Sequence, residues 1–335
     1  MAFTANEHRY ETMDYARCGR SGLLLPRVSL GFWHNFGTDC DRENMRQLCF
    51  TALDCGITHF DLADNYGPVP GSAEANLGRI LKDDLHAYRD ELIISTKAGY
   101  DMWEGPYGNW GSRKHLIAGL DQSLSRLGLD YVDIFYHHRM DPNTPLEETI
   151  NTLCDIVKQG KALYIGLSNY DGPTMERAAI LLDKRHCPFV INQNRYSMLD
   201  RTIERNGLKS SVMKKEKGLI AFSPLAQGLL SDRYLHGIPD DSRAVRDGRY
   251  LKTAQLTDKR LAQMACLNAL AGQRGQTLAQ MALSWVLKDD AVTSVLTGAS
   301  KPEQIRENAA MANQNHHFSD EELRSIDQIL EVPLD

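Results

Sequence analysis

The sequence lacks several features that would assign it at once to a large class of proteins. Its apolar runs are only as long as strands, far short of the roughly 20 residues that span a bilayer. Residues 1–9 lack the apolar centre of a secretion signal. Acidic residues outnumber basic ones by 44 to 38, which indicates no basic surface for nucleic acid. We therefore predict a cytoplasmic protein that binds neither membranes nor nucleic acids.

Metal-site and nucleotide-binding motifs are also missing. The seven cysteines form no Cys-x-x-Cys pair, which favours reduced, buried thiols over disulfides or zinc. The sequence contains no Gly-x-Gly-x-x-Gly, Walker loop, Gly-x-Ser-x-Gly or His-Glu-x-x-His. His137 and His138 are adjacent in an expected strand, where neighbouring side chains point to opposite faces. We therefore expect no metal, and no Rossmann turn to hold a cofactor.

What the sequence does contain is an alternation of short apolar runs and helix-period segments between about residues 28 and 315. Eight strand–helix units of this size imply parallel strands joined by right-handed crossovers. They fit a closed (β/α)8 TIM barrel of the α/β class better than an open doubly wound sheet. Since no proline- or serine-rich linker divides the chain, we predict one domain over residues 1–335. The expected strands are 28–31, 57–60, 92–96, 132–137, 164–167, 189–191, 219–222 and 292–296.

The remaining residues are assigned to additions around the barrel. We expect a hairpin within residues 1–27, a long loop at 228–259 and a C-terminal helix capped by Ser319 and Glu322. Residues 144–147, Thr-Pro-Leu-Glu, predict a helix start with a threonine N-cap, a proline at the first helical position and a capping-box glutamate.

Four polar residues follow the expected strands, at the end of a barrel that carries functional groups. Asp61, Lys97 and His138 each close an apolar run, and Tyr66 follows in the next loop. A carbonyl that accepts a hydride also needs a proton, so the set predicts carbonyl reduction. Tyr66 would be the acid in reduction and the base in oxidation. We expect Lys97 to lower the tyrosine pKa from about 10, Asp61 to orient Lys97, and His138 to bond the substrate carbonyl.

These residues resemble the motifs of the aldo-keto reductases, NADP-dependent enzymes built on a (β/α)8 barrel. Residues 57–67 resemble the family signature around the aspartate and the catalytic tyrosine, and residues 94–97 resemble its lysine strand. Residues 133–139 resemble its histidine strand, with His138 rather than His137 in the catalytic register. The resemblance spans nearly the whole chain.

The resemblance implies NADP(H) as cofactor and places its contacts at the strand ends. Ser168, Asn169 and Gln193 match positions that bond the nicotinamide carboxamide, and Tyr196 matches an aromatic residue that stacks on the nicotinamide ring. Residues 223–230 match the loop over the pyrophosphate. The full set of implied cofactor contacts is Trp33, Asp61, Tyr66, Ser168, Asn169, Gln193, Tyr196, Ser223, Pro224, Leu225, Gln227, Gly228, Arg233, Gly298, Ser300, Lys301, Gln304, Glu307 and Asn308.

The implied adenosine end lies within residues 298–308. Ser300 and Lys301 precede an expected helix start, which suits a phosphate because the first amide groups of a helix are free. The resemblance therefore favours NADP over NAD, with Gln304 and Asn308 facing the adenine.

Two loops, 64–74 and 98–108, resemble within the family a bacterial subgroup that reduces L-glyceraldehyde 3-phosphate and is related to potassium-channel β-subunits. This implies a small-aldehyde substrate and a homo-oligomer, a tetramer or octamer. The resemblance implies reduction of L-glyceraldehyde 3-phosphate to glycerol 3-phosphate, with methylglyoxal-type aldehydes also accepted. Arg113 is the first candidate to bind the substrate phosphate, and Arg139 is the second.

Two other functions are open at this point. Lys97 could form a Schiff base with a carbonyl substrate, as in class I aldolases. The protein could instead be a regulatory subunit that senses NADP with slow turnover.

Overall fold

The computed structural model describes residues 3–67, 69–235, 237–238, 245 and 251–331. Eight parallel strands close into a barrel in which each strand pairs with its neighbours in chain order and β10 returns to β3. The predicted (β/α)8 barrel is confirmed. The strands are β3 (Val28–Gly31), β4 (His59–Asp61), β5 (Ile93–Ala98), β6 (Val132–His137), β7 (Ala162–Ser168), β8 (Phe189–Arg195), β9 (Gly218–Phe222) and β10 (Ser294–Thr297).

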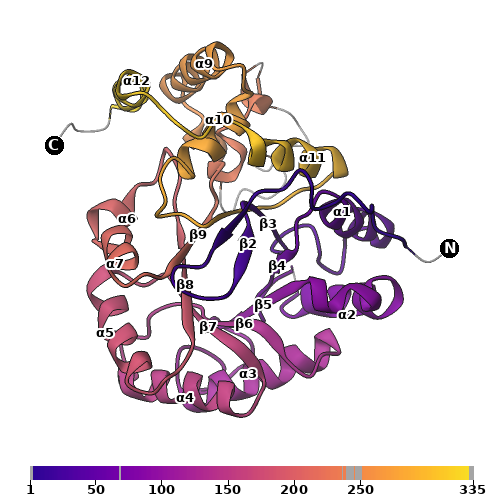
Figure 1. Cartoon of the computed structure of the whole chain (residues 1–335). Helices are drawn as coiled ribbons and strands as arrows, with labels where there is room; N and C mark the ends of the chain where they lie inside the picture. The colour runs from indigo at the N-terminus through magenta and orange to yellow at the C-terminus, as the bar shows by residue number, and fades with distance from the viewer. Residues whose placement is uncertain (1–2, 68, 236, 239–244, 246–250, 332–335) are drawn as a thin grey trace.

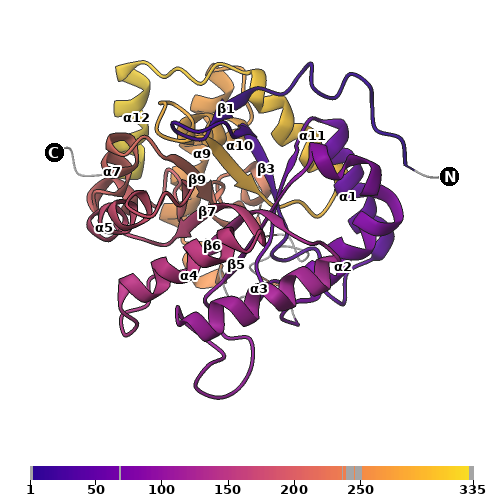
Figure 2. The same ribbon diagram turned by 60° about the horizontal axis from the view of Figure 1, so that its bottom comes forward.

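Helices surround the strands as an outer ring (Figure 1 and Figure 2). The longer ones bury an apolar stripe with helical spacing; in α1 the stripe includes Met45, Leu48 and Ala52. Two further helices, α9 (Asp258–Gln273) and α12 (Asp320–Leu330), pack on one another outside this ring. The ring contains α1 (Arg42–Asp54), α2 (Ser72–Ile80), α3 (Arg113–Leu127), α4 (Leu146–Lys158), α5 (Gly172–Asp183), α6 (Thr202–Arg205), α7 (Leu208–Lys214), α10 (Leu278–Val286) and α11 (Pro302–Ala310).

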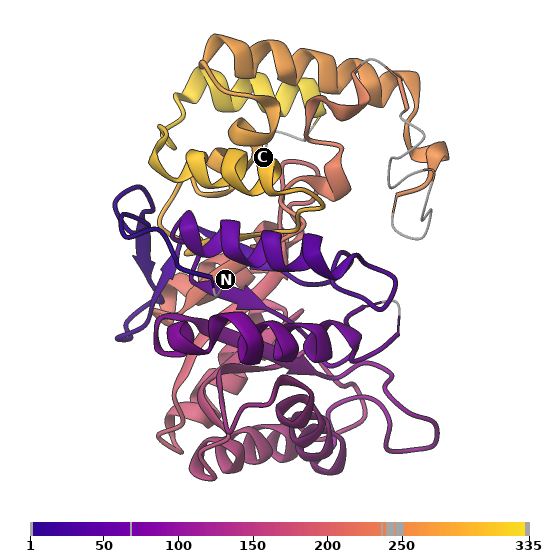
Figure 3. The ribbon, with the colours of Figure 1, turned by 90° about the vertical axis from the view of Figure 1, so that its right-hand side faces the viewer.

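The expected N-terminal hairpin is present and consists of β1 (Tyr15–Arg17) and β2 (Leu24–Pro26), which pair antiparallel. Leu25 is fully buried in the same cluster as Ile134 and Ile220 of the barrel interior. The hairpin covers one end of the barrel, at the left in Figure 3, and the long loop after β5 extends from the opposite end. The open end is therefore the one reached by the carboxyl ends of the strands.

Aromatic packing fills the interior beneath that open end. Tyr136 of β6 is fully buried, and a Cβ atom at Gly166 of β7 would lie 2.3 Å from its ring. Only glycine permits this approach. The Tyr136 ring lies 5.4 Å from the Nζ atom of Lys97, so it forms part of the floor below the site.

Outside the strands, the predicted start of α4 needs correction and the predicted start of α12 holds. Thr144 does not cap α4, because Pro145 occupies the N-cap position and no side chain caps the helix. The carboxylate of Asp141 accepts the amide of Thr144 at 3.1 Å and so fixes a turn before α4. The capping box of α12, formed by Ser319 and Glu322, is confirmed.

The expected loop at 228–259 is only partly described, since residues 236, 239–244 and 246–250 lie outside the described part of the chain. Helix α9 begins near the end of this segment and was not predicted. It buries only Met264, Leu267 and Ala271, so its sequence carries a weak apolar stripe. No helix in the described part of the chain is long and apolar enough to cross a membrane.

Candidate active site

A buried ion pair lies at the centre of the open end. The Nζ atom of Lys97 on β5 is 2.5 Å from Oδ2 of Asp61 on β4, and it also donates to the carbonyl of Leu62 at 2.6 Å. Both charged side chains are fully buried. Burial lowers the pKa of Lys97, while Asp61 opposes that shift. This contact places Asp61 where the sequence predicted that it would orient Lys97.

Tyr66 lies directly above this pair. Its ring centroid is 5.0 Å from the Nζ atom of Lys97, 5.8 Å from the ring of His138 and 6.3 Å from that of Trp33. The structure therefore brings together all four residues expected to act in catalysis, with Trp33 beside them.

The pKa of Tyr66 is not lowered, contrary to what was expected from the nearby Lys97. The pKa of Tyr66 is raised well above its usual value, first by desolvation of the phenol and then by the negative charge of Asp61. Lys97 does not reverse this shift because Asp61 compensates its charge at 2.5 Å. The phenol therefore stays protonated across the neutral pH range, which suits a proton donor.

His138 follows β6 and is held by backbone contacts. Its amide donates to the carbonyl of Ala98 at 2.9 Å, and its carbonyl accepts from Nδ2 of Asn169 at 3.0 Å. Burial and, next, the charge of Lys97 lower the pKa of His138 well below its usual value, so the ring is neutral. His137 faces the outer layer, where its Nδ1 atom is 2.7 Å from the Tyr170 hydroxyl.

Three residues predicted to bond a nicotinamide carboxamide gather around these groups. Gln193 of β8 donates from Nε2 to Oδ1 of Asp61 at 3.1 Å. Ser168 ends β7 and accepts from Asn169 at 3.2 Å. Asn169 adopts a left-handed backbone with a φ of 57°, which turns its amide toward His138. The geometry thus places amide and hydroxyl groups next to the four residues predicted to act in catalysis.

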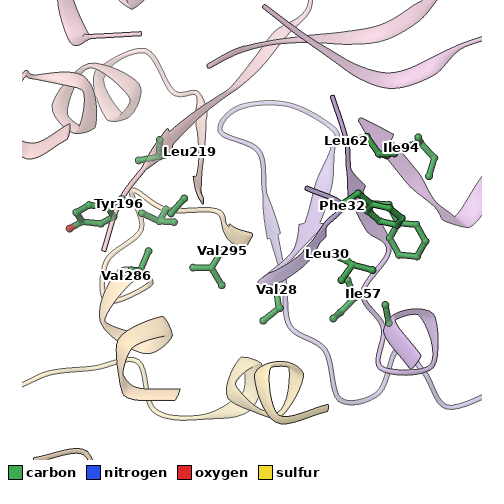
Figure 4. Packing of buried hydrophobic residues seen from close by; sticks show 14 of the residues in the cluster. Val28, Leu30, Phe32, Ile57, Leu62, Ile94, Tyr196, Leu219, Val286 and Val295 are labelled. Carbon is green, nitrogen blue, oxygen red and sulfur yellow. The ribbon is translucent and has the colours of Figure 1, made fainter. Parts of the chain in front are cut away.

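Tyr196 is not brought to this site. Its ring is fully buried and lies 5.3 Å from the ring of Trp285. Its hydroxyl donates to Glu204 at 2.5 Å and accepts from Lys288 at 3.0 Å. Figure 4 shows it among residues such as Leu219 and Val286, between the barrel and α10. Gln193 and Arg195 take the inward positions of β8, so the next residue points outward.

Phe222 supplies an aromatic ring at the mouth on the β9 side, and the sequence analysis did not predict it. It ends β9 opposite Arg195 of β8, and it packs, partly buried, on the interior cluster that contains Ile220. Ile220 and Phe222 are two residues apart and so share the inner face of β9. The sequence did contain a pattern that places Phe222 on the inner face: it is two residues after Ile220 and directly precedes the loop at 223–230.

The loop after β9 has an unusual backbone. Ser223, Ala226 and Gln227 have φ values of 53°, 48° and 62°, and left-handed non-glycine residues of this kind concentrate at ligand-binding sites. Nε2 of Gln227 donates to the Ser223 hydroxyl at 3.0 Å. Pro224, Leu225 and Gly228 lie in the same loop, and Arg233 follows on the 3-10 turn Asp232–Tyr234.

A cleft of about 450 Å³ opens beside this loop. Two arginines, Arg195 and Arg260, line it together with Ser223 and Gln227. Cationic and hydroxyl groups of this kind suit a diphosphate.

The predicted adenosine end lies at the N-terminus of α11. The amide and hydroxyl of Ser300 and the amide of Lys301 all donate to Oε1 of Gln304, at 2.8, 3.2 and 3.3 Å. These three donors converge on the Gln304 side-chain oxygen, and a phosphate oxygen could take its place. Ser300 and Lys301 are exposed, as is Gly298 before them.

The two other residues predicted at this end lie one turn further along α11. Asn308 is buried. Glu307 is exposed and accepts from the Thr277 hydroxyl at 3.2 Å.

The structure separates the two arginines proposed for the substrate phosphate. Arg113 pairs with Asp155 of α4 at 2.6 Å in the outer helical layer. Arg139 follows His138, and its guanidinium lies 4.1 Å from the ring of Tyr100 and 3.8 Å from that of Trp110. The order of preference from the sequence is therefore reversed, with Arg139 now ahead of Arg113.

A (β/α)8 barrel with a buried aspartate–lysine pair, a protonated tyrosine and a neutral histidine at its mouth defines an oxidoreductase of the carbonyl-reducing class. The chain belongs to the aldo/keto reductase family, whose model matches residues 27–331. Members of this family use nicotinamide cofactors. In the part of the chain that is described, no cluster of His, Cys, Asp or Glu could hold a metal ion.

Similar proteins come from bacteria and plants. The chain is 55% identical over 331 residues to the L-glyceraldehyde 3-phosphate reductase of Escherichia coli (strain K12), covering 98% of this chain and 95% of that protein. It is 35% identical over 301 residues to a probable voltage-gated potassium channel subunit beta of Oryza sativa subsp. japonica, covering 88% and 90% of the two chains.

Proposed function

We propose that this protein reduces small aldehydes with NADPH. L-glyceraldehyde 3-phosphate, giving glycerol 3-phosphate, is the best candidate substrate, and methylglyoxal-type aldehydes would be accepted too. The observation that carries the proposal is the placement of Tyr66 within 5.0 Å of the Lys97 ammonium and 5.8 Å of the His138 ring. When bound, the reduced nicotinamide supplies the hydride.

The four polar residues at the mouth bind the substrate carbonyl and supply its proton. Neutral His138 donates a hydrogen bond to the substrate carbonyl and fixes which face is presented. Tyr66 delivers its proton to the carbonyl oxygen as negative charge develops there. Lys97, held by Asp61, keeps a positive charge beneath the phenol and so stabilises the phenolate that remains.

The cofactor would lie across the mouth of the barrel, with its nicotinamide at Phe222 and its adenosine end at α11. Ser168, Asn169 and Gln193 bond the carboxamide, and Phe222 takes the stacking place first assigned to Tyr196. The 223–230 loop covers the pyrophosphate. The fit is supported by the partly buried ring of Phe222 on the inner face of β9 and by the three donors that converge at Ser300 and Lys301.

Replacing Ser300 and Lys301 together with alanine is expected to weaken NADPH binding while leaving NADH binding little changed. Only NADPH carries the 2′-phosphate, so only NADPH loses a charge-assisted contact of about 1.5–3 kcal/mol, or roughly 10- to 150-fold in Kd. Fluorescence titration of both cofactors measures the effect. Equal losses for both would mean that these residues do not bind the phosphate.

Replacing Arg139 with methionine is expected to lower kcat/KM for L-glyceraldehyde 3-phosphate relative to glyceraldehyde by roughly 10- to 150-fold. Methionine keeps an unbranched chain between the rings of Tyr100 and Trp110 but removes the charge. The hydrogen bonds of Arg139 to Gly99 and Asn109 are lost for both substrates alike, so the ratio isolates the phosphate contact.

Arg113→Met is the matched control, because its guanidinium is engaged by Asp155; the substrate ratio should not change in this variant. If the wild-type enzyme shows no preference for the phosphorylated aldehyde, the phosphate-specific substrate is wrong. The protein would then be a general aldehyde reductase.

The two alternatives from the sequence are less well supported. A Schiff base needs an accessible neutral amine, whereas Lys97 is fully buried and already bonded to Asp61 and Leu62. Borohydride trapping with a ketose phosphate tests it. An NADP sensor would bind the cofactor but show little turnover when NADPH absorbance is followed against a panel of phosphorylated and unphosphorylated aldehydes.

We also infer that the protein acts in the cytoplasm as a single-domain homo-oligomer, a tetramer or octamer. Size-exclusion chromatography with light scattering tests the oligomeric state.

A further inference from the structure

A chain of buried hydrogen bonds leads through the barrel interior to Asp61. The hydroxyls of Ser294 and Ser29 are 2.7 Å apart, and Ser29 is 2.9 Å from Nδ1 of His59. Nε2 of His59 is 3.0 Å from the hydroxyl of Ser95, which donates to Oδ1 of Asp61 at 2.7 Å. All five side chains are fully buried. They come from four adjacent strands, β10, β3, β4 and β5.

The series of hydrogen bonds ends at the carboxylate of Asp61, and this fixes which atom donates in every bond. Asp61 only accepts, so Ser95 must donate to it and must itself accept from His59. This fixes the neutral ring with its proton on Nε2, leaving Nδ1 to accept from Ser29, which in turn accepts from Ser294. Burial lowers the pKa of His59 to about 4, in keeping with a neutral ring at pH 7. Each donor points toward Asp61, so each bond polarises the next.

We propose that His59 is a positioning residue for catalysis, which acts through Ser95 to hold Oδ1 of Asp61 and thereby presents Oδ2 to Lys97. The inference rests on the proposed function, since Asp61 and Lys97 support the proton transfer from Tyr66.

These hydrogen-bonded polar side chains differ from the apolar residues that otherwise pack the barrel interior. The interior toward the hairpin is filled mainly by apolar side chains, among them Ile134, Ile220 and Leu296. Placing an imidazole and three hydroxyls in such an interior is costly unless each is bonded. Here the bonded series ends on the carboxylate of Asp61, which pairs with Lys97.

Removing the His59 donor is expected to disturb one bond to Asp61 specifically. The Ser95 hydroxyl would lose the donor that orients it, so its bond to Oδ1 would be less well fixed. The other contact of Oδ1, from Gln193, is longer at 3.1 Å. Substrate and cofactor contacts at the mouth stay unchanged. We expect kcat to fall roughly 10- to 100-fold, as when outer hydrogen-bond partners are removed at metal sites, with KM and the NADPH Kd unaltered.

The test compares His59→Leu, His59→Gln, Ser95→Ala and the Leu/Ala double variant of the full chain. Leucine removes both ring nitrogens at similar size, whereas the glutamine amide can donate to Ser95 and accept from Ser29. We expect His59→Leu and Ser95→Ala to lower kcat alike, the double variant to fall no further because both act through one bond, and glutamine to restore much of kcat.

Tyr170→Phe is the matched control, because it removes a buried hydroxyl–histidine bond, to His137 at 2.7 Å, that does not lead to Asp61. It should lower the melting temperature without the fall in kcat. A native kcat in His59→Leu, additive losses in the double variant, or no recovery with glutamine would each overturn the proposal. If His59→Leu does not fold, Ser95→Ala tests the same bond on its own, and a native kcat there overturns it.

The proposed function is checked in the same assays. If wild type shows no turnover, or Tyr66→Phe turns over normally, the proposed function fails and this inference fails with it. If both behave as expected while His59→Leu retains native kcat, only the role of His59 is overturned.

Discussion

Replacing Tyr66 with phenylalanine is expected to lower kcat for aldehyde reduction by roughly 100-fold or more, the usual range for loss of a general acid. The variant keeps the ring near Trp33 and above Lys97 but has no phenol proton to deliver. Cofactor affinity should be retained, because the hydroxyl is assigned to the proton and not to the nucleotide. Steady-state NADPH oxidation and a fluorescence titration measure the two quantities.

Tyr100→Phe provides a control for the loss of a phenol at the same mouth. Tyr100 contacts the edge of the His138 ring at 4.6 Å and has no assigned proton transfer, so this variant should keep most of its turnover. If Tyr66→Phe folds normally and keeps near-native kcat, Tyr66 is not the proton donor.

Replacing Lys97 with methionine is expected to abolish most turnover and also to destabilise the fold by about 3–5 kcal/mol, the cost of leaving one partner of a buried ion pair alone. Asp61 is fully buried and would keep a charge without its cation at 2.5 Å. Urea denaturation followed by circular dichroism measures the free energy of unfolding. The double variant Asp61→Asn/Lys97→Met should recover much of the stability but none of the turnover.

Lys161→Met is the control for this experiment, because Lys161 pairs with Asp121 at 2.6 Å while both side chains are partly exposed. Surface pairs of this kind contribute no more than about 1 kcal/mol. If Lys97→Met proves as stable as wild type, the pair does not behave as a buried ion pair.

The sequence by itself determined the barrel and the main parts of the site. Alternating apolar runs and helical stripes are local patterns, and eight of them leave few ways to close a sheet. Asp61, Lys97 and His138 were found because parallel strands carry their carboxyl ends to one mouth. The start of α12 was predicted because a capping box is also a local pattern. Helix α9 was missed because its apolar stripe is weak.

Only the tertiary structure decided which side chains face that mouth and in what state of charge. Strand length and register put Phe222 inside the barrel and Tyr196 outside it, and a one-residue difference reverses a face. The pKa of Tyr66 depends on how strongly its phenol is desolvated and on the charge balance between Asp61 and Lys97. The bond between Ser294 and Ser29 joins β10 to β3, whose contact appears only when the barrel closes. Such properties depend on distances in space, which no spacing along the chain supplies.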